Sequence, residues 1–383
     1  MDEKKEKIKK RHSKKFYIWL GVICATIATL LTFFLVTWFC GCDNTLKYIQ
    51  AYNYSYEGNA NIEVVKYPEQ NFVEINNKKG EPLKILQLTD IHLGCGLFTI
   101  TLDKKVVNEV FKCVESVDPD IIVVTGDALS AIYLTSGTKN TYLQLDALIM
   151  LLEKLGRPYT FCFGNHDGDG LASKEYIADK LESAQNSFFL RGEKDVAGVG
   201  NYYAKILDNG VLTSSMIFMD SGGKKFFGYE GVSSDQVKWY EQTINTLKEE
   251  KSDIKNLLFM HIPIPEYDIF YNKWSEGDEN YELKIGVKAE RVCPGQQNGL
   301  YDKIKQLDST KWVFCGHDHT NNFAITEKIT NITLCYGMSM DYSAYPLLKF
   351  KTEQRGANVI SVDSFGDVSI EHATQDNNYA LTA

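Results

Sequence analysis

The sequence lacks several features that would place it in a common protein class. Its nine cysteines include no C-x-x-C pair, so nothing supports a zinc ribbon or a thioredoxin-like motif. No internal repeat or low-complexity tract is present. The net charge is −9, with +5 in the tail over residues 1–15 and −14 in the rest of the chain. Because an acidic body does not offset the phosphates of a nucleic acid, we expect no nucleic-acid binding.

Charged residues and proline are also missing from one long apolar stretch, residues 16–40. As a helix, this stretch would be about 37 Å long, enough to cross a bilayer core of about 30 Å. A buried core helix would carry a polar stripe, and a signal peptide would be shorter with a small-residue cleavage site. We therefore expect an uncleaved transmembrane signal anchor that ties the protein to a membrane.

The basic tail at residues 1–15 sets the expected orientation of this anchor. Lys-rich flanks stay on the cytosolic side, so the chain from about residue 43 onward should lie in a lumen or outside the cell. The secretory pathway, the endolysosomal pathway and the cell surface fit equally well.

Such a compartment permits disulfides and glycosylation. The cysteines are odd in number and irregularly spaced, so we expect buried free thiols in the apolar runs. These thiols are Cys95, Cys113, Cys162, Cys315 and Cys335. Of the two glycosylation sequons, Asn53 is the better candidate, because Asn331 lies in a strand-like stretch.

Apolar periodicity predicts an α/β fold with a two-sheet β sandwich flanked by helices, preceded by the transmembrane helix. Residues 41–80 are expected to form a stalk with lead-in strands, residues 81–374 the catalytic domain, and residues 375–383 a C-terminal tail. The predicted strands are 83–88, 121–124, 159–163, 211–219, 256–260, 312–315, 332–336, 357–362 and 367–372, and the predicted helices are 102–116, 142–155 and 234–249.

The stretch 262–298 does not fit this alternation, because it is long, aromatic and poorly periodic. Long segments of this kind inside a domain are usually functional loops or lids. A surface insertion without a functional role is an equally good interpretation.

Polar side chains follow five of the predicted strands, at the point where each strand ends. The carboxyl ends of strands are where open α/β sheets bind ligands. The chain has only seven His, and five of them fall in these segments. The candidate residues are Asp90, His92, Asp127, Asn165, His166, His261, His317 and His319.

Imidazole and carboxylate together suit borderline divalent metals such as zinc, iron and manganese. Two such ions can bind both an attacking hydroxide and the oxygens of a phosphoryl group, and a metal-bound water ionises near neutral pH. One carboxylate must bridge the two ions. Asp127, alone at the end of its strand, is the candidate for that position.

The five segments resemble the motifs of the calcineurin-like metallophosphoesterases, in the same order. D-x-H, G-D, G-N-H-D, a single His and G-H-x-H occur over roughly residues 83–320. Further stretches, such as 219–222 and 232–239, are similar to the purple-acid-phosphatase-like branch. Two departures stand out: Ser130 replaces the metal-binding Tyr of true purple acid phosphatases, and His92 is a ligand they lack. No tyrosinate-to-iron colour is therefore expected, and the metal pair need not include Fe(III).

The resemblance implies a metallophosphoesterase fold and a division of roles. Asp90, His92, Asp127 and His319 would hold one ion, and Asp127, Asn165, His261 and His317 the other. His166 would be catalytic, either stabilising charge or protonating the leaving alcohol, with Asp167 orienting it. Asp318 is expected to point away, and pocket or structural roles both remain open for Asp341, Tyr342, Tyr345 and Arg355. No substrate-binding residue is assigned.

The function predicted from these features is dimetal-dependent hydrolysis of a phosphate ester by metal-bound hydroxide, using two ions drawn from Fe, Zn or Mn. One alternative is a phosphodiesterase acting on a lipid head group or a nucleotide. The other is a catalytically silent, membrane-tethered binding protein on the same scaffold. The sequence indicates no protein partner.

Overall fold

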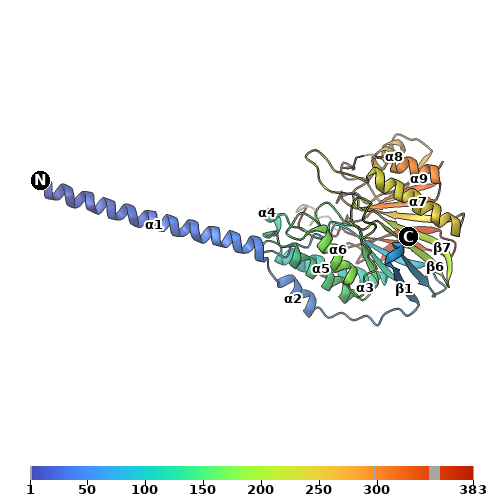
Figure 1. Cartoon of the computed structure of the whole chain (residues 1–383), viewed down its shortest axis with the longest axis horizontal. Helices are drawn as coiled ribbons and strands as arrows, with labels where there is room; N and C mark the ends of the chain where they lie inside the picture. The colour runs from blue at the N-terminus through green and yellow to red at the C-terminus, as the bar shows by residue number, and fades with distance from the viewer. Residues whose placement is uncertain (1, 297, 345–353, 383) are drawn as a thin grey trace.

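The computed structural model describes residues 2–296, 298–344 and 354–382. Two β-sheets pack against each other, and helices cover their outer faces (Figure 1). One long N-terminal helix projects away from this body, with the N-terminus at its free end. The predicted two-sheet α/β fold with flanking helices is confirmed.

The larger sheet has nine strands among the described residues, in the order β1-β2-β6-β7-β8-β10-β12-β11-β9. Its centre, β7 to β12, is parallel. Helices α7 (Ser234–Glu250), α8 (Glu266–Ser275) and α9 (Leu300–Leu307) contribute to a buried cluster on one of its faces. The strands are β1 (Ile62–Tyr67), β2 (Phe72–Asn77), β6 (Tyr202–Asp208), β7 (Val211–Phe218), β8 (Lys255–Phe259), β9 (Tyr281–Ile285), β10 (Thr310–Cys315), β11 (Ala324–Glu327) and β12 (Ile332–Tyr336).

The smaller sheet has six strands within the described ranges, in the order β15-β14-β13-β3-β4-β5. Strands β3, β4 and β5 are parallel, and β13 pairs with β3 in the antiparallel sense. Its strands are β3 (Leu83–Leu88), β4 (Ile121–Val124), β5 (Tyr159–Phe161), β13 (Gly356–Val362), β14 (Val368–Thr374) and β15 (Leu381–Thr382). The remaining helices are α2 (Asn44–Ala51), α3 (Ile100–Val117), α4 (Tyr133–Ser136), α5 (Thr141–Leu155) and α6 (Lys174–Ser183), and the 3₁₀ turn η1 (Pro68–Gln70) connects β1 to β2 of the larger sheet.

Two buried amide side chains bridge the sheets. Gln87 of β3 donates to the carbonyl oxygen of Cys315 in β10, at 3.0 Å. Asn358 of β13 donates to the carbonyl oxygen of Tyr336 in β12, at 2.8 Å, and to the side-chain oxygen of Gln87, at 2.9 Å. Buried amides need such partners, so these bonds favour one register of the sandwich. That register fixes how the ends of β3 and β10 face each other.

The lead-in strands expected within residues 41–80 are present as β1 and β2, whereas α2 and β15 occupy the places expected for a stalk and a C-terminal tail. Within residues 41–80, α2 lies against α3 and α5, and β1 and β2 form one edge of the larger sheet. Within residues 375–383, β15 pairs with β14, and the ring of Tyr379 is buried. These segments carry too few apolar residues in regular spacing to be recognised as parts of the body from sequence.

The stretch 262–298 is ordered as secondary structure rather than as a long loop. It holds α8, and β9 pairs with β11 at the other edge of the larger sheet. Its aromatic side chains are used in packing, since Tyr267 and Phe270 are buried. The first part of the stretch is therefore structural, while residues 286–296 form no helix or strand.

The cysteine prediction is confirmed, since the five thiols expected in apolar runs are buried and free. The expectation for Asn331 is wrong. This residue has a φ of 55° and lies on the exposed turn just before β12, because the strand-like pattern begins only at Ile332. Asn53 is also exposed, so both sequons lie on the surface.

Helix α1 (Asp2–Cys40) contains a 27-residue span, Lys14–Cys40, with a mean hydropathy of 2.3, and none of its most apolar window is buried. This helix is long and apolar enough to cross a membrane. Its last turns touch the body: the carbonyl oxygen of Trp38 accepts from the Lys139 amide at 2.9 Å, and the Trp38 ring packs on Tyr133. Helix α1 and the body are thus joined by contacts as well as by the chain.

His372, on β14, predicts an acid sensitivity of the fold. Burial lowers the pKa of His372 to about 4, from an ordinary value of 6.5, so the folded protein keeps this ring neutral. The unfolded chain takes up the proton first as the pH falls, so stability decreases between about pH 6.5 and pH 4. Between pH 7.5 and pH 5 this loss should be about 2 kcal/mol.

The His372→Leu variant should lack this part of the pH dependence. Urea unfolding at both pH values, with wild type and variant side by side, measures it. An equal pH dependence in the two proteins would show that His372 is protonated as readily in the fold as in the unfolded chain.

Candidate metal centre

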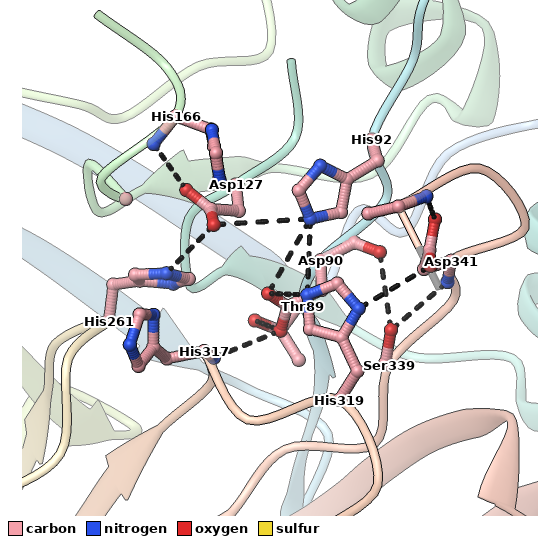
Figure 2. Close-up of polar contacts among 12 residues, drawn as sticks. Thr89, Asp90, His92, Asp127, His166, His261, His317, His319, Ser339 and Asp341 are labelled. Carbon is pink, nitrogen blue, oxygen red and sulfur yellow. Dashed lines mark hydrogen bonds and ion pairs between the residues drawn. The ribbon is translucent and has the colours of Figure 1, made fainter. Parts of the chain in front are cut away.

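Strand ends from both sheets converge on one cluster of polar side chains (Figure 2). From the smaller sheet, Asp90 and His92 follow β3, and Asp127 follows β4. From the larger sheet, His261 follows β8, and His317 and His319 follow β10. Asn165 and His166 follow β5, and the His166 amide contacts Asp127. The structure thus brings the predicted residues together at one edge of the sandwich.

The cluster contains two groups of three side chains, each with ligand atoms within 4.8 Å of one another. One group is Asp90, His92 and His319, and the other is Asp127, His261 and His317. All six side chains are buried. Each group matches the number of protein ligands that holds an ion while leaving a position for a reactant.

In the first group, the imidazole of His319 lies between a carboxylate and another imidazole. Its Nε2 is 3.2 Å from Oδ1 of Asp90 and 3.2 Å from Nε2 of His92. The other oxygen of Asp90 accepts from the hydroxyl of Thr89 at 2.8 Å and from the amide of His317 at 3.1 Å. These bonds leave Oδ1 directed at the two histidines.

Asp127 lies between the two groups. Its Oδ2 is 3.2 Å from Nε2 of His261 and 3.9 Å from Nε2 of His92. Its Oδ1 accepts from the amide of His166 at 2.7 Å. One carboxylate oxygen therefore faces both groups of side chains, as Figure 2 shows, which is the position that a bridging ligand requires.

Backbone and carboxylate partners orient the outer nitrogens of two imidazoles. Nδ1 of His261 lies 2.8 Å from the carbonyl oxygen of Thr125, and Nδ1 of His319 lies 3.4 Å from Oδ2 of Asp341. A hydrogen on Nδ1 leaves Nε2 with its lone pair directed inward. Metal-binding histidines are commonly held in this way.

Burial and local charge set the ionisation of the cluster. Burial and the neighbouring His319 lower the pKa of His92 to about 4, and burial and His261 lower the pKa of His317 to about 3. Burial opposes ionisation of Asp127, but His261 outweighs it and holds the pKa of that carboxyl well below its usual range. Against the effect of burial, Asp127 raises the pKa of His261 to about 9, and Asp90 raises the pKa of His319 well above its ordinary value. Metals coordinate neutral imidazoles and ionised carboxylates, so metal binding would displace protons from these two rings.

Several of these residues have a backbone conformation that non-glycine residues rarely adopt. The φ angles are 52° at Asp90, 51° at His92, 49° at Asp127 and 81° at His317. Such conformations cost on the order of 1–3 kcal/mol each and concentrate at functional sites. Here they turn the chain sharply after β3, β4 and β10, which aims side chains from successive residues at the same place.

Gly164 allows the loops after β4 and β5 to approach closely. A Cβ on Gly164 would lie 2.2 Å from Oδ1 of Asp127 and 2.3 Å from its amide nitrogen. The glycine of the G-N-H-D motif therefore serves to bring Asn165 and His166 against the central carboxylate.

The donors present fit a pair of metal ions. Among the described residues, Oδ1 of Asn165 and Nδ1 of His317 are buried without a hydrogen-bond partner. Uncompensated buried polar atoms and carboxylates are costly, and a cation would satisfy them. Two nitrogens at about 2.1 Å from one ion lie about 3.0–3.4 Å apart at ordinary ligand angles, which matches His92 and His319.

Comparison with known protein families decides the assignment. Residues 83–321 match the model of the calcineurin-like phosphoesterase family. The chain belongs to this family. The purple-acid-phosphatase-like resemblance is confirmed by a relative from Arabidopsis thaliana named "Probable inactive purple acid phosphatase 14", which is 28% identical over 68% of this chain and 71% of its own length.

A second relative of this chain is "Phosphatase DCR2" of Saccharomyces cerevisiae, at 29% identity over 66% of the chain. The alignment spans 47% of the yeast protein, so about half of that relative has no counterpart here. Among solved structures, a dimetal phosphatase from Danio rerio matches with a TM-score of 0.50 at 10% identity. It covers 76% of this chain and 96% of its own, and shows that the fold is shared.

The expectation that Asp167 orients His166 is wrong. The carboxylate of Asp167 points the other way and accepts from the amides of Asp127, Leu129 and Gly164 at 2.7–3.0 Å. Nδ1 of His166 instead lies 2.9 Å from Oδ2 of Asp169. Asp167 therefore shapes the loop, and Asp169 orients the imidazole.

Two further residues at the site, Lys224 and Tyr229, were not expected from the sequence. Nζ of Lys224 lies 3.0 Å from Nε2 of His166, and the ring of Tyr229 packs edge-on against His317 with centroids 4.3 Å apart. Both belong to one hairpin after β7: Lys224 lies in the segment G-G-K-K-F-F-G at residues 222–228, and Tyr229 follows it directly.

The structure also shows the positions of most residues whose roles the sequence did not decide. Asp318 points away from the cluster, as expected, and accepts from the hydroxyl of Tyr336 at 2.7 Å. Arg355 is buried and lies over the ring of Tyr342, at 3.8 Å, in a structural role. Asp341 contacts His319, as described above. Tyr345 lies outside the described residues.

Proposed function

We propose that the protein hydrolyses phosphate monoesters at this cluster, holding two metal ions with the residues that the sequence singled out. The observation that carries the proposal is the position of Asp127 between two buried groups of three ligand-type side chains. One relative is named a phosphatase and another a probable inactive purple acid phosphatase, so their names do not settle whether this chain is active. The proposal therefore rests on the ligand-type side chains of this chain.

The donor set supports a division of ligands. Asp90, His92 and His319 would hold one ion, His261, His317 and Asn165 the other, and Asp127 both. Two such ions would supply Lewis acidity to the phosphoryl group and lower the pKa of a water. The metals suited to these imidazole and carboxylate donors are Zn, Fe and Mn.

His166 lies beside the ligands rather than among them, which suits proton transfer. In the hydrolysis, a water oxygen bonds to phosphorus, the bond from phosphorus to the alcohol oxygen breaks, and inorganic phosphate leaves. The alcohol oxygen takes a proton from His166, which recovers one from the attacking water through solvent. Asp169, at 2.9 Å, holds the imidazole in place for this transfer.

The His166→Ala variant should keep its metals and lose about 10²–10⁴ in kcat, the usual contribution of general acid catalysis. The loss should be larger on phenyl phosphate than on p-nitrophenyl phosphate, because nitrophenolate departs readily without a proton. Steady-state rates on both reporters and metal analysis measure this. An equal loss of kcat on the two reporters would argue that His166 stabilises negative charge on the phosphoryl group instead of protonating the leaving alcohol.

Lys224 is proposed to bind the substrate phosphate, because its ammonium lies 3.0 Å from Nε2 of His166 and 44% of its side chain is exposed. The Lys224→Met variant should raise KM for p-nitrophenyl phosphate about tenfold, with a smaller change in kcat. The control is Lys180→Met, which removes an exposed charge on α6, over the ring of Tyr176. An unchanged KM in Lys224→Met would remove this residue from the binding site.

The test of the proposed function is metal-dependent turnover by the full chain. The purified protein, loaded in turn with Zn, Mn or Fe, is offered matched monoester and diester aryl reporters. We expect about two ions per chain and faster turnover of the monoester. Metal binding without turnover on either reporter would favour the silent binding protein, and faster diester turnover would favour the phosphodiesterase.

We also propose that α1 is a signal anchor and that the catalytic body faces a lumen or the cell exterior. The supporting observations are the exposed apolar face of α1 and its basic N-terminal flank. Protease treatment of sealed microsomes tests the orientation. Digestion of the whole body by the protease, with protection of the N-terminal tail, would show the opposite orientation.

A further inference from the structure

The hairpin over residues 222–231 carries an exposed aromatic tip. Lys224 and Tyr229 pair as a bridge, and the amide of Lys225 donates to the carbonyl oxygen of Gly228 at 3.0 Å, which closes a tight turn. Phe226 and Phe227 form the tip and are 93% and 84% exposed. Two adjacent phenylalanines this exposed indicate an interaction site.

The base of this hairpin is part of the metal centre's surroundings. Lys224 contacts His166 from one arm of the hairpin, and Tyr229 packs on His317 from the other. The arms therefore stand over the cluster of ligand-type side chains. Whatever the tip contacts is held close to the place where a substrate phosphate would bind.

A short chain of contacts also joins the metal centre to the end of the membrane helix. The carbonyl oxygen of Trp38 accepts from the amide of Lys139 at 2.9 Å, and Nζ of Lys139 donates to the carbonyl oxygen of Asp169 at 3.0 Å. Asp169 in turn holds His166 at 2.9 Å. The loop that precedes α7 projects on the side of the body from which α1 leaves (Figure 1).

More apolar side chains are exposed around the end of α1. Leu134 of α4 is 86% exposed, and Leu97 and Phe98 are 42% and 54% exposed. The amide of Phe98 donates to the carbonyl oxygen of Ser136 at 3.3 Å, so this pair lies against α4, which itself packs on Trp38 through Tyr133. We call Leu97, Phe98, Leu134, Phe226 and Phe227 the apolar rim.

We propose that the apolar rim sits in the headgroup layer of the membrane that α1 crosses, and that the substrate is a phosphate monoester carried by a lipid of that membrane. This inference rests on the proposed function and names its substrate class. Aromatic and leucine side chains beside lysines are the composition that lies at a bilayer surface. With the rim seated there, Lys224 and Lys225 lie at the depth of lipid phosphates. Lys224 also contacts His166 beside the metal centre.

The experiment compares two substrates with the metal-loaded full chain in phosphatidylcholine nanodiscs. One substrate is dioleoyl phosphatidate placed in the same disc, and the other is soluble p-nitrophenyl phosphate. The variant is Phe226→Ser combined with Phe227→Ser, at tip positions that bury nothing in the body. The control is Phe365→Ser, since Phe365 is 77% exposed on the β13–β14 turn, at the opposite end of the sheets from the ligands.

We expect the double variant to turn over phosphatidate at least tenfold more slowly than wild type while hydrolysing the soluble reporter within about twofold. The control should match wild type on both substrates. Equal phosphatidate rates in the double variant and wild type would overturn the inference. Turnover of the soluble reporter but not of phosphatidate by wild type would overturn it as well, while no turnover of either would count against the proposed function itself.

A binding measurement separates docking from catalysis. Tryptophan is introduced as Phe226→Trp or, as the control, Phe365→Trp, and brominated phosphatidylcholine is used as the quencher. The emission added by Phe226→Trp over the parent protein should be quenched, and that of Phe365→Trp should not. Equal quenching at the two positions would show that the hairpin tip stays in water.

Discussion

The Asp127→Asn variant of the full chain is expected to lose bound metal and at least about 10³ of its turnover. Asn keeps the size of the side chain and can still accept the 2.7 Å bond from the His166 amide. It removes the charge from the oxygen that faces His261 at 3.2 Å and His92 at 3.9 Å. Metal ions supply several kcal/mol of charge stabilisation to such reactions, which corresponds to a rate factor of this size.

The control for this prediction is the neighbouring carboxylate that points away. Asp318→Asn keeps an acceptor for the Tyr336 hydroxyl at 2.7 Å and touches neither group of ligands. It should retain about two ions and turn over substrate within about threefold of wild type. Metal analysis and p-nitrophenyl phosphate turnover are measured on both variants. Full metal content and activity in Asp127→Asn would rule out a bridging carboxylate at this position.

A single methyl group at Gly164 should be nearly as damaging. The added Cβ of Gly164→Ala would lie 2.2 Å from Oδ1 and 2.3 Å from the amide nitrogen of Asp127, so the loops after β4 and β5 must separate. That movement also strains the bond from the Gly164 amide to Asp167, now 2.7 Å long. We expect turnover to fall at least 100-fold and the free energy of unfolding to drop by about 1–3 kcal/mol.

Gly168→Ala is the matched control in the same loop. Its nearest neighbour would be Cγ of Lys174, at 3.4 Å, which is an ordinary contact at the stem of a flexible side chain. Turnover and urea unfolding should stay close to wild type. If Gly164→Ala behaved in the same way, the close approach of the two loops would not be needed for the site.

The parts of the site that could be predicted from sequence are those encoded locally. A short apolar strand followed by Asp, Asn or His is visible in a few residues, and β3, β4 and β10 were predicted to within two residues at each end. Because parallel strands bring their carboxyl ends to one edge, five such segments in order predict a shared site without any knowledge of long-range packing.

The parts that could not be predicted depend on contacts between distant segments. Lys224 is 58 residues from His166, in a hairpin with no periodic pattern, so nothing local placed it at the site. The expectation that Asp167 orients His166 failed for a related reason. It rested on adjacency along the chain, but the turn after β5 directs the Asp167 carboxylate to backbone amides, and Asp169 faces the imidazole.

The position of β3 has a consequence for how the protein is made. This strand leads to Asp90, early in the chain, and it pairs with β4 on one side and with β13 on the other, where Leu83 faces Val362 and Gln87 faces Asn358. A ribosome that has finished His319 has already supplied all the ligand-type residues, yet one edge of β3 is still unpaired. The nascent polypeptide thus completes the smaller sheet only once β13 has been synthesised, well after His319.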